Sequence, residues 1–319
     1  MLLTDDQTMI REAARTFAQA EVAPLAAEWD QTAEFPTDIA RRLGELGFLG
    51  MTISEEWGGA GADNVSLALV IEEISAADAA CGLLVGLQNS VVCAPINQFG
   101  TNEQKERYLR PAARGEIRGC FCLTEPQAGS DASNLRTTAD LRGNRYVING
   151  SKQFISSGAS ADIALIFGVT DSDSGKKGIS AFIVPTDSPG YRVVAKEDKL
   201  GQRASDTCQL SFEDLEVFPD MVLGELGEGY RIALANLEGG RIGIGAQALG
   251  IARAAYEAAL SYAKERESMG QAIIQHQAVA FRIADMATKI EVARQMIWHA
   301  AALKDSGRPA LKEACMAKL

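Results

Sequence analysis

The sequence has few of the residues that build metal sites or nucleophilic triads. Its 319 residues include two histidines, His276 and His299, and six cysteines, none of which forms a CxxC pair. Zinc-ligand spacing is therefore absent, and a Ser-His-Asp triad has no support. We interpret the histidines as helix-surface or hydrogen-bonding residues, and the cysteines as reduced thiols of a cytosol-like compartment.

Long runs of positive charge or of apolar residues are also missing. No run of Lys or Arg exceeds a pair and the net charge is −11, so the basic stripe that nucleic-acid binding needs is absent. No signal-peptide pattern opens the sequence, and apolar runs such as residues 163–169 are too short to cross a bilayer. We expect a soluble protein with no nucleic-acid or membrane partner, either cytoplasmic in a bacterium or mitochondrial after processing.

The pattern that is present changes twice along the chain. Thr4-x-x-Gln7 and Thr101-x-x-Gln104 are capping boxes within a helical first third. Short β-type runs separated by turn signals begin near residue 119, and a helical period returns near residue 228. We predict an α+β protein with a helical domain at 1–118, a small antiparallel β-barrel or sandwich at 119–222, and a helical bundle at 223–319.

Two common nucleotide-binding signatures do not apply. Gly243-x-Gly245-x-x-Ala248 matches a dinucleotide fingerprint in letters, but it lies inside a helical pattern with no strand before it. We interpret these small residues as positions of close helix packing. Neither a Walker A loop nor a G-x-S-x-G elbow occurs.

Residues 123–131, with the sequence LTEPQAGSD, open the β region. A strand is expected to end at Pro126, which cannot donate to a ladder. Gly129, Ser130 and Asp131 then supply a flexible turn with free N–H groups and a hydroxyl, suited to a phosphate or a flavin edge. An ordinary polar loop is the alternative reading of the same residues.

Further motifs follow this segment in a fixed order, and together they resemble the acyl-CoA dehydrogenase family. They are NGSK at 149–152, FIS at 154–156, KGISAF at 177–182, KLGQR at 199–203, GGRIGI at 239–244, Arg266, and HQ at 276–277. The resemblance runs from the first helix to Leu319 and is closest to short-chain and short-branched-chain members.

The resemblance implies a flavoprotein oxidoreductase of fatty-acid β-oxidation or branched-chain amino-acid catabolism. In this family a helical, a β and a second helical domain enclose FAD and an acyl-CoA. A carboxylate removes the α-proton while the β-hydride passes to the flavin. The electrons then go to an electron-transfer flavoprotein, and the assembly expected is a homotetramer, or at least a homodimer.

The resemblance also implies roles for individual residues. Thr124 and Ser156 would hydrogen-bond the flavin edge, while Arg266 and Gln277 would reach the FAD of a neighbouring subunit. The residues expected to bind FAD are Phe121, Leu123, Thr124, Gly129, Ser130, Phe154, Ile155, Ser156, Arg266 and Gln277. Those expected to contact the acyl-CoA are Ser130, Glu238, Gly239, Gly240 and Arg241.

The catalytic base has no candidate in this sequence. In most family members it is a Glu in the final helical segment, which we expect C-terminal to Leu319, so we read the chain as incomplete and with little or no activity. In a minority of members the base lies where Gly240 stands, and Glu238 points about 200° away from that position on the helix. Phe154 replaces a common Trp beside the flavin, and Met269 replaces a common Phe after Arg266.

Three other functions fit parts of the pattern. An oxidase or monooxygenase of the same fold would reoxidise its reduced flavin rapidly in air. A non-catalytic binding relative would lack the terminal Glu even in the complete gene. A helical bundle with a β insert and no cofactor would purify colourless.

Overall fold

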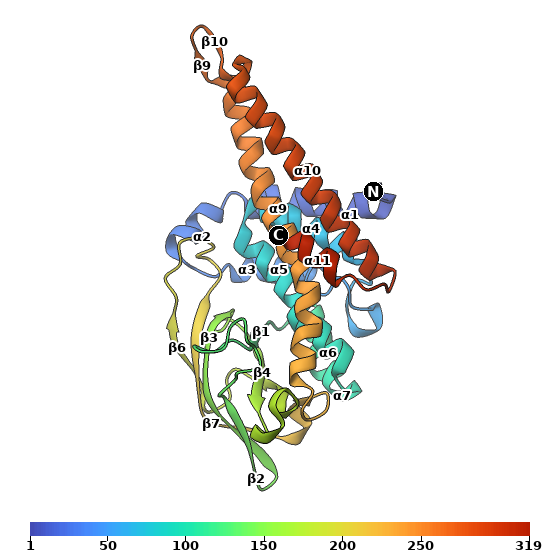
Figure 1. Cartoon of the computed structure of the whole chain (residues 1–319), viewed down its shortest axis with the longest axis vertical. Helices are drawn as coiled ribbons and strands as arrows, with labels where there is room; N and C mark the ends of the chain where they lie inside the picture. The colour runs from blue at the N-terminus through green and yellow to red at the C-terminus, as the bar shows by residue number, and fades with distance from the viewer. The chain divides into compact units, whose positions relative to one another are not determined.

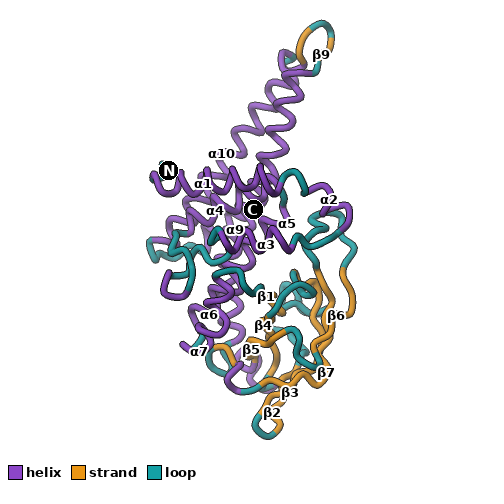
Figure 2. The backbone as a smooth tube through the Cα atoms, turned by 180° about the vertical axis from the view of Figure 1, so that it is seen from behind, coloured by secondary structure: helices purple, strands orange, loops and turns teal.

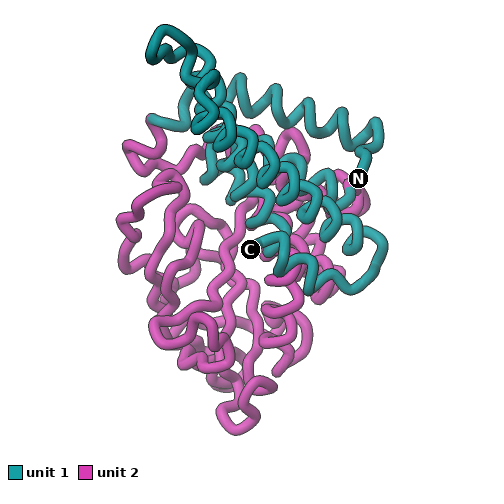
Figure 3. The backbone as a smooth tube through the Cα atoms, turned by 45° about the horizontal axis from the view of Figure 1, so that its top comes forward, with its two compact units in different colours: residues 1–27, 63–83, 241–319 teal, residues 28–62, 84–240 magenta.

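The computed structural model describes all 319 residues as two compact units, shown in Figure 3. Unit 1 comprises residues 1–27, 63–83 and 241–319, and unit 2 comprises residues 28–62 and 84–240. The predicted order of helical, β and helical segments is confirmed, because strands β1 to β8 all lie between Gly119 and Leu223. The two boundaries between the three domains drawn from the sequence stay a prediction.

Unit 1 is helical apart from one short hairpin. Its elements are α1 (Asp5–Phe17), the π-helical turn η1 (Ala18–Val22), α4 (Asn64–Ala77), the first part of α5 (Ala79–Leu87), most of α9 (Gly229–Glu265), β9 (Glu267–Ser268), β10 (Gln271–Ala272), the 3₁₀ turn η7 (Ile273–Gln275), α10 (Gln277–Asp305) and α11 (Leu311–Lys318). Within this unit α9 and α10 run side by side, joined at one end by the β9–β10 hairpin (Figure 1).

Two neighbouring carboxylates on α4 tie the helices of unit 1 together. Glu72 and Glu73 are each 4% exposed. Arg15 of α1 and Arg253 of α9 approach Glu73 at 2.8 and 2.7 Å, and Arg294 of α10 approaches Glu72 at 2.9 Å. Because buried carboxylates are stable only when they are paired, these contacts fix the positions of α1, α9 and α10 around α4.

The small residues of α9 serve close packing, as the sequence predicted. A Cβ on Gly245 would lie 2.7 Å from the carbonyl oxygen of Ala317 in α11. A Cβ on Gly250 would lie 2.4 Å from the carbonyl oxygen of Glu72 in α4. The dinucleotide reading of Gly243 to Ala248 is therefore excluded, since the whole segment is helix.

Unit 2 combines short helices with all eight strands of the main sheet. Its α-helical and π-helical elements are most of α2 (Ala26–Thr32), α3 (Thr37–Glu45), the last residues of α5, the π-helical turn η3 (Gln88–Cys93), α6 (Ala94–Phe99), α7 (Asn102–Gln104), the π-helical turn η4 (Lys105–Leu109), α8 (Arg110–Ala113) and the first turns of α9. Three 3₁₀ turns also belong to it: η2 (Glu55–Trp57), η5 (Ser172–Gly178) and η6 (Pro219–Met221). Its strands are β1 (Gly119–Cys122), β2 (Thr138–Arg142), β3 (Arg145–Ser156), β4 (Ile163–Val169), β5 (Ile179–Pro185), β6 (Tyr191–Lys196), β7 (Thr207–Val217) and β8 (Val222–Leu223). Figure 2 shows these strands gathered together.

The sheet does not match the predicted antiparallel barrel in two respects. Its strand order is β6-β7-β3-β2-β4-β5-β8 with β1 beside β4, and no pairing joins the two ends, so closure into a barrel is not confirmed. The pairs β1–β4 and β2–β4 are parallel, which makes the sheet mixed. The prediction failed there because parallel pairing depends on connections that single-strand patterns do not reveal.

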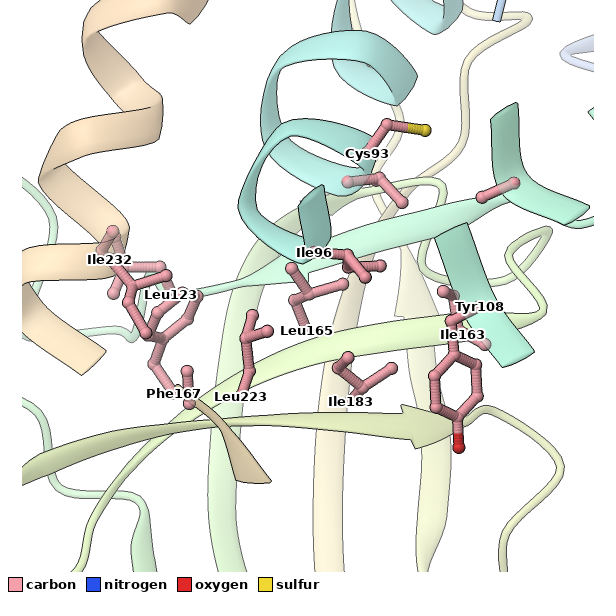
Figure 4. Packing of buried hydrophobic residues seen from close by; sticks show 14 of the residues in the cluster. Cys93, Ile96, Tyr108, Leu123, Ile163, Leu165, Phe167, Ile183, Leu223 and Ile232 are labelled. Atoms are coloured by element: carbon pink, nitrogen blue, oxygen red, sulfur yellow. The ribbon is translucent and has the colours of Figure 1, made fainter. Parts of the chain in front are cut away.

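Two buried clusters lie on the two faces of the sheet. One contains alternate residues of β4 and β5, such as Leu165, Phe167 and Ile183, packed on Cys93, Ile96 and other helical residues (Figure 4). The other contains the intervening residues, such as Ile166 and Phe182, packed on β3 and β7. The nearly continuous apolar runs of β4 and β5 follow from burial on both faces.

Both predicted capping boxes are present. The Thr4 hydroxyl accepts the Gln7 N–H at the start of α1, and Thr101 and Gln104 repeat the arrangement at α7.

One apolar helical segment was not predicted from the sequence. Ala79–Phe99 is long and apolar enough by composition to cross a membrane, but 67% of its most apolar window is buried. A core helix of a globular protein has the same properties, so this segment is weak support for a membrane span.

All six cysteines are unpaired, and five of them are buried. Burial raises the pKa of the Cys93 thiol to about 12. A thiol with so high a pKa is not a nucleophile, so Cys93 acts as a small apolar core residue.

We predict that Gly250→Ala destabilises the protein by roughly 1–3 kcal/mol, because the new methyl group overlaps the α4 backbone at Glu72. Urea unfolding followed by circular dichroism measures this change. Gly201→Ala is the control, since no atom lies within 4 Å of the added Cβ, and it should change stability by less than about 0.5 kcal/mol. Equal stability of the two variants would show that α4 and α9 pack less closely than described.

Candidate functional site

The segment after β1 forms a tight turn around Pro126. Glu125 N–H donates to the Ala128 carbonyl and Ala128 N–H donates to the Glu125 carbonyl, each at 3.0 Å. Pro126 and Gln127 form the corner, where the missing N–H of proline is not needed. Leu123 is buried on the helical face of the sheet, while Thr124 is only half-buried. The turn thus presents Thr124 and hides its two neighbours.

The second predicted segment lies in β3 and is bent by a bulge. The register of β3 against β7 shifts between Lys152 and Ile155. Within the shift Phe154 has a φ of 58°, and its side chain is 58% exposed. A positive φ is strained for a bulky residue, and such strain often marks a functional position. The bulge directs the Phe154 ring away from the core.

Backbone contacts bring the two segments together. Gln153 N–H donates to the Thr124 carbonyl at 2.9 Å, so Thr124 and Phe154 are neighbours although 30 positions separate them. Neither the Thr124 hydroxyl nor the hydroxyls of Ser130 and Ser156 make a hydrogen bond within the protein. These groups remain available to a ligand.

The loop at Gly129 and Ser130 is open. Both residues are exposed, and a Cβ on Gly129 would have no neighbour within 4 Å. The next residue, Asp131, accepts the N–H and hydroxyl of Ser133 at 3.2 and 2.5 Å, which fixes the end of the loop. Open space, free hydroxyls and an exposed aromatic ring together fit a large aromatic and phosphorylated group such as FAD.

Two other predicted apolar contacts, Phe121 and Ile155, lie at or below the surface. The rings of Phe121 and Phe167 have centroids 4.7 Å apart, and Phe121 packs against the helical face of the sheet. Ile155 is 2% exposed and packs in the cluster on the opposite face. Its side chain therefore points away from Phe154, and any contact of Ile155 with a ligand would involve its backbone.

Four of the five residues predicted to contact the acyl-CoA occupy consecutive positions of α9, and the fifth is Ser130 of the open loop. Glu238, Gly239, Gly240 and Arg241 are all half-buried. A Cβ on Gly240 would lie 3.7 Å from the Ser90 hydroxyl of η3, an ordinary contact distance. Gly240 has no group that accepts a proton, as the sequence already showed.

Arg266 and Gln277 bracket the β9–β10 hairpin of unit 1. Both side chains are exposed, and neither makes an ion pair or hydrogen bond within the chain. The hairpin is fastened by His276, whose two ring nitrogens lie 3.2 Å from Gln271 Nε2 and from the Ser268 carbonyl. This confirms the hydrogen-bonding role expected for His276, and it leaves Arg266 and Gln277 free for a partner.

Sequence reasoning missed the ion pair that lies beneath the turn. Lys152 and Glu125 are 1% and 3% exposed, and Lys152 Nζ lies 2.7 Å from Glu125 Oε1. Burial lowers the pKa of Lys152, although Glu125 opposes that shift. Burial also raises the pKa of Glu125, but Lys152 and backbone donors outweigh it, so that pKa is lowered. No periodic signal marked Lys152, because a lysine in a strand normally faces solvent.

Family models match the chain in three consecutive parts. They describe the acyl-CoA dehydrogenase N-terminal domain at residues 4–116, the middle domain at 120–215 and the C-terminal domain at 227–319. A short-chain-specific acyl-CoA dehydrogenase of Clostridium acetobutylicum is 44% identical over 317 residues, covering 99% of this chain and 84% of the relative.

Two solved structures agree along nearly the whole chain. Butyryl-CoA dehydrogenase of Megasphaera elsdenii superimposes with a TM-score of 0.97 at 40% identity, over 99% of this chain and 84% of the other. A chain from a structure described as the electron transferring flavoprotein of Acidaminococcus fermentans gives 0.98 at 47% identity, over 99% and 83%. At these identities the likeness extends beyond the fold.

We predict that Phe154→Gly raises the stability of the FAD-free protein by roughly 0.5–1 kcal/mol. Glycine removes the steric strain of the positive φ, and this gain exceeds the conformational entropy that the more flexible unfolded chain loses on folding. Urea unfolding measures the change. Ala33→Gly is the control, since Ala33 has a similar φ of 55° outside the site. A loss above about 1 kcal/mol in Phe154→Gly alone would show that the exposed ring contributes to packing.

Proposed function

The chain belongs to the acyl-CoA dehydrogenase family, and on that premise we propose that it binds FAD and dehydrogenates a short-chain acyl-CoA between Cα and Cβ. The observation that carries this proposal is the junction of Thr124 with the Phe154 segment through the Gln153 N–H. That junction gathers free hydroxyls and an exposed ring at one place, as a flavin site requires.

Each residue of the junction has a defined task in this proposal. The hydroxyls of Thr124 and Ser156 donate to the flavin edge and favour its reduced form. Phe121 and Phe154 supply apolar contact. Leu123 and Ile155, whose side chains are buried in the two clusters of the sheet, contribute through their backbones. Gly129 and Ser130 leave room for the phosphates. FAD, once bound, would supply the acceptor for the hydride that leaves the β-carbon.

The substrate and the partners complete the proposal. Ser130 and the stretch from Glu238 to Arg241 would contact the CoA portion of the thioester. Arg266 and Gln277 have no partner within the chain and would reach the FAD of a second subunit. The functional unit would then be at least a homodimer, and the assembly typical of the family is a homotetramer. The similarity to a chain from the Acidaminococcus fermentans flavoprotein structure supports an electron-transfer flavoprotein as the electron acceptor.

The proton that leaves Cα needs a carboxylate, and the Glu expected C-terminal to Leu319 remains a proposal. A chimera tests it directly. In the chimera, Leu319 is followed by the part of the Clostridium acetobutylicum enzyme that lies beyond the matched region. Both proteins should bind FAD, and anaerobic butyryl-CoA should bleach the flavin at least about 100-fold faster in the chimera, as expected for gain of a general base.

Each alternative has a distinct outcome in this experiment. Failure of both proteins to bind FAD contradicts the proposed function. Equal bleaching rates contradict only the location of the base. If the reduced flavin reoxidises faster in air than with electron-transfer flavoprotein, the chain is an oxidase of the same fold.

We predict that Thr124→Val raises the FAD dissociation constant about fivefold, the equivalent of one lost hydrogen bond. Stability of the FAD-free protein should not fall, because this hydroxyl has no partner in the protein. Isothermal titration calorimetry with FAD measures the affinity. Thr138→Val, the same change at a half-buried position of β2, is the matched control. An equal effect of both variants would place Thr124 outside the site.

A further inference from the structure

Lys152 is among the largest side chains that are fully buried in this protein, and it carries a charge. Its ammonium group donates to Glu125 Oε1 at 2.7 Å and to the Leu123 carbonyl at 3.1 Å. An ammonium group taken out of water is strongly unfavourable unless it is paired and hydrogen-bonded. These two acceptors, 27 and 29 positions before it in the chain, are therefore what allows Lys152 to lie there.

The Glu125 carboxylate is fully engaged as well. Its Oε1 also accepts the N–H of Thr137 at 3.1 Å, and its Oε2 accepts the N–H of Arg136 at 2.6 Å and the amide of Gln127 at 2.7 Å. The ion pair thus joins the end of β1, the turn, the approach to β2 and the middle of β3. Four chain segments meet at one pair of charges.

Thr124 lies between the two residues that Lys152 holds. Lys152 fixes the Leu123 carbonyl and the Glu125 side chain, and Gln153 N–H fixes the Thr124 carbonyl. Every backbone neighbour of Thr124 is anchored, whereas its hydroxyl is left without a partner. This arrangement leaves the Thr124 hydroxyl free to bind a ligand and fixes the position of the backbone that carries it.

We propose that the Lys152–Glu125 ion pair is a positioning device that holds the Thr124 hydroxyl against the flavin; this inference rests on the proposed function. A purely stabilising role explains the pair poorly, since apolar residues of similar volume often stabilise a core as well as a buried ion pair does. Neither Lys152 nor Glu125 needs to touch the flavin. Both act through Thr124.

The first test uses the FAD-free protein. The double variant Glu125→Gln/Lys152→Met removes both charges, retains an oxygen acceptor for a backbone N–H, and avoids leaving one charge buried alone. Amide hydrogen exchange of residues 123–128 should rise at least about tenfold, while exchange in β5 stays unchanged. Unchanged exchange in residues 123–128 would overturn the proposal, because the pair would then hold nothing.

The second test is a double-mutant cycle on bound FAD. The pair is replaced both in the wild type and in Thr124→Val, and the FAD dissociation constant and the flavin midpoint potential are measured. Replacement should weaken FAD binding about tenfold in the wild type and less than about threefold in Thr124→Val, because the device then has no hydroxyl to hold. Equal factors in the two backgrounds would overturn the proposal.

Phe212→Leu separates positioning from general destabilisation. Phe212 is 2% exposed in β7 and packs in the cluster on the face of the sheet opposite the helices. This variant should unfold at lower urea concentration yet keep the wild-type FAD affinity and potential. If it lowered FAD affinity as much as the pair replacement does, the pair would be no more than a stabilising element. Wild-type protein that binds no FAD would instead contradict the proposed function, and this inference with it.

Discussion

The buried ammonium group of Lys152 is the constraint on which the candidate site depends. Its bonds to the Leu123 carbonyl and to Glu125 cross between β3 and the end of β1. In a low-dielectric interior these contacts are strong and leave little freedom of position. The turn above them can therefore be polar and exposed at its tip without being mobile at its base.

Unit 1 uses buried charge in a different way. There the carboxylates of Glu72 and Glu73 lie on one helix, and arginines from three other helices converge on them. Each guanidinium offers several donors in a rigid plane, so one network fixes several helix directions at once. In unit 2 a single lysine provides a point anchor for a turn. The arginine network of unit 1 sets the directions of helices, whereas Lys152 of unit 2 fixes the position of one backbone segment.

The sequence predicted best the features that local chemistry decides. The capping box at Thr4 and the start of the β region near residue 119 were found because a few adjacent residues specify them. Strand β2 could not be singled out, because residues 138–142 have the sequence TADLR and only Ala139 among them is buried, so no apolar run marks the strand. The burial of Lys152 could not be predicted, since the partners that make it tolerable lie 27 and 29 positions away and only tertiary contact joins them.

The local sequence also could not predict that the side chain of Phe154 points outward while that of Ile155 is buried. Residues 154–156 were expected as one flavin-lining group, but the bulge in β3 divides them, with Phe154 outward and Ile155 in the core. A strict alternation along β3 would place Phe154 on the same face as Lys152, beneath the sheet. The bulge reverses this, and the paired ladder with β7 on either side holds the strained residue in place. One irregularity thus puts an anchor inside the protein and an aromatic ring outside it only two positions apart.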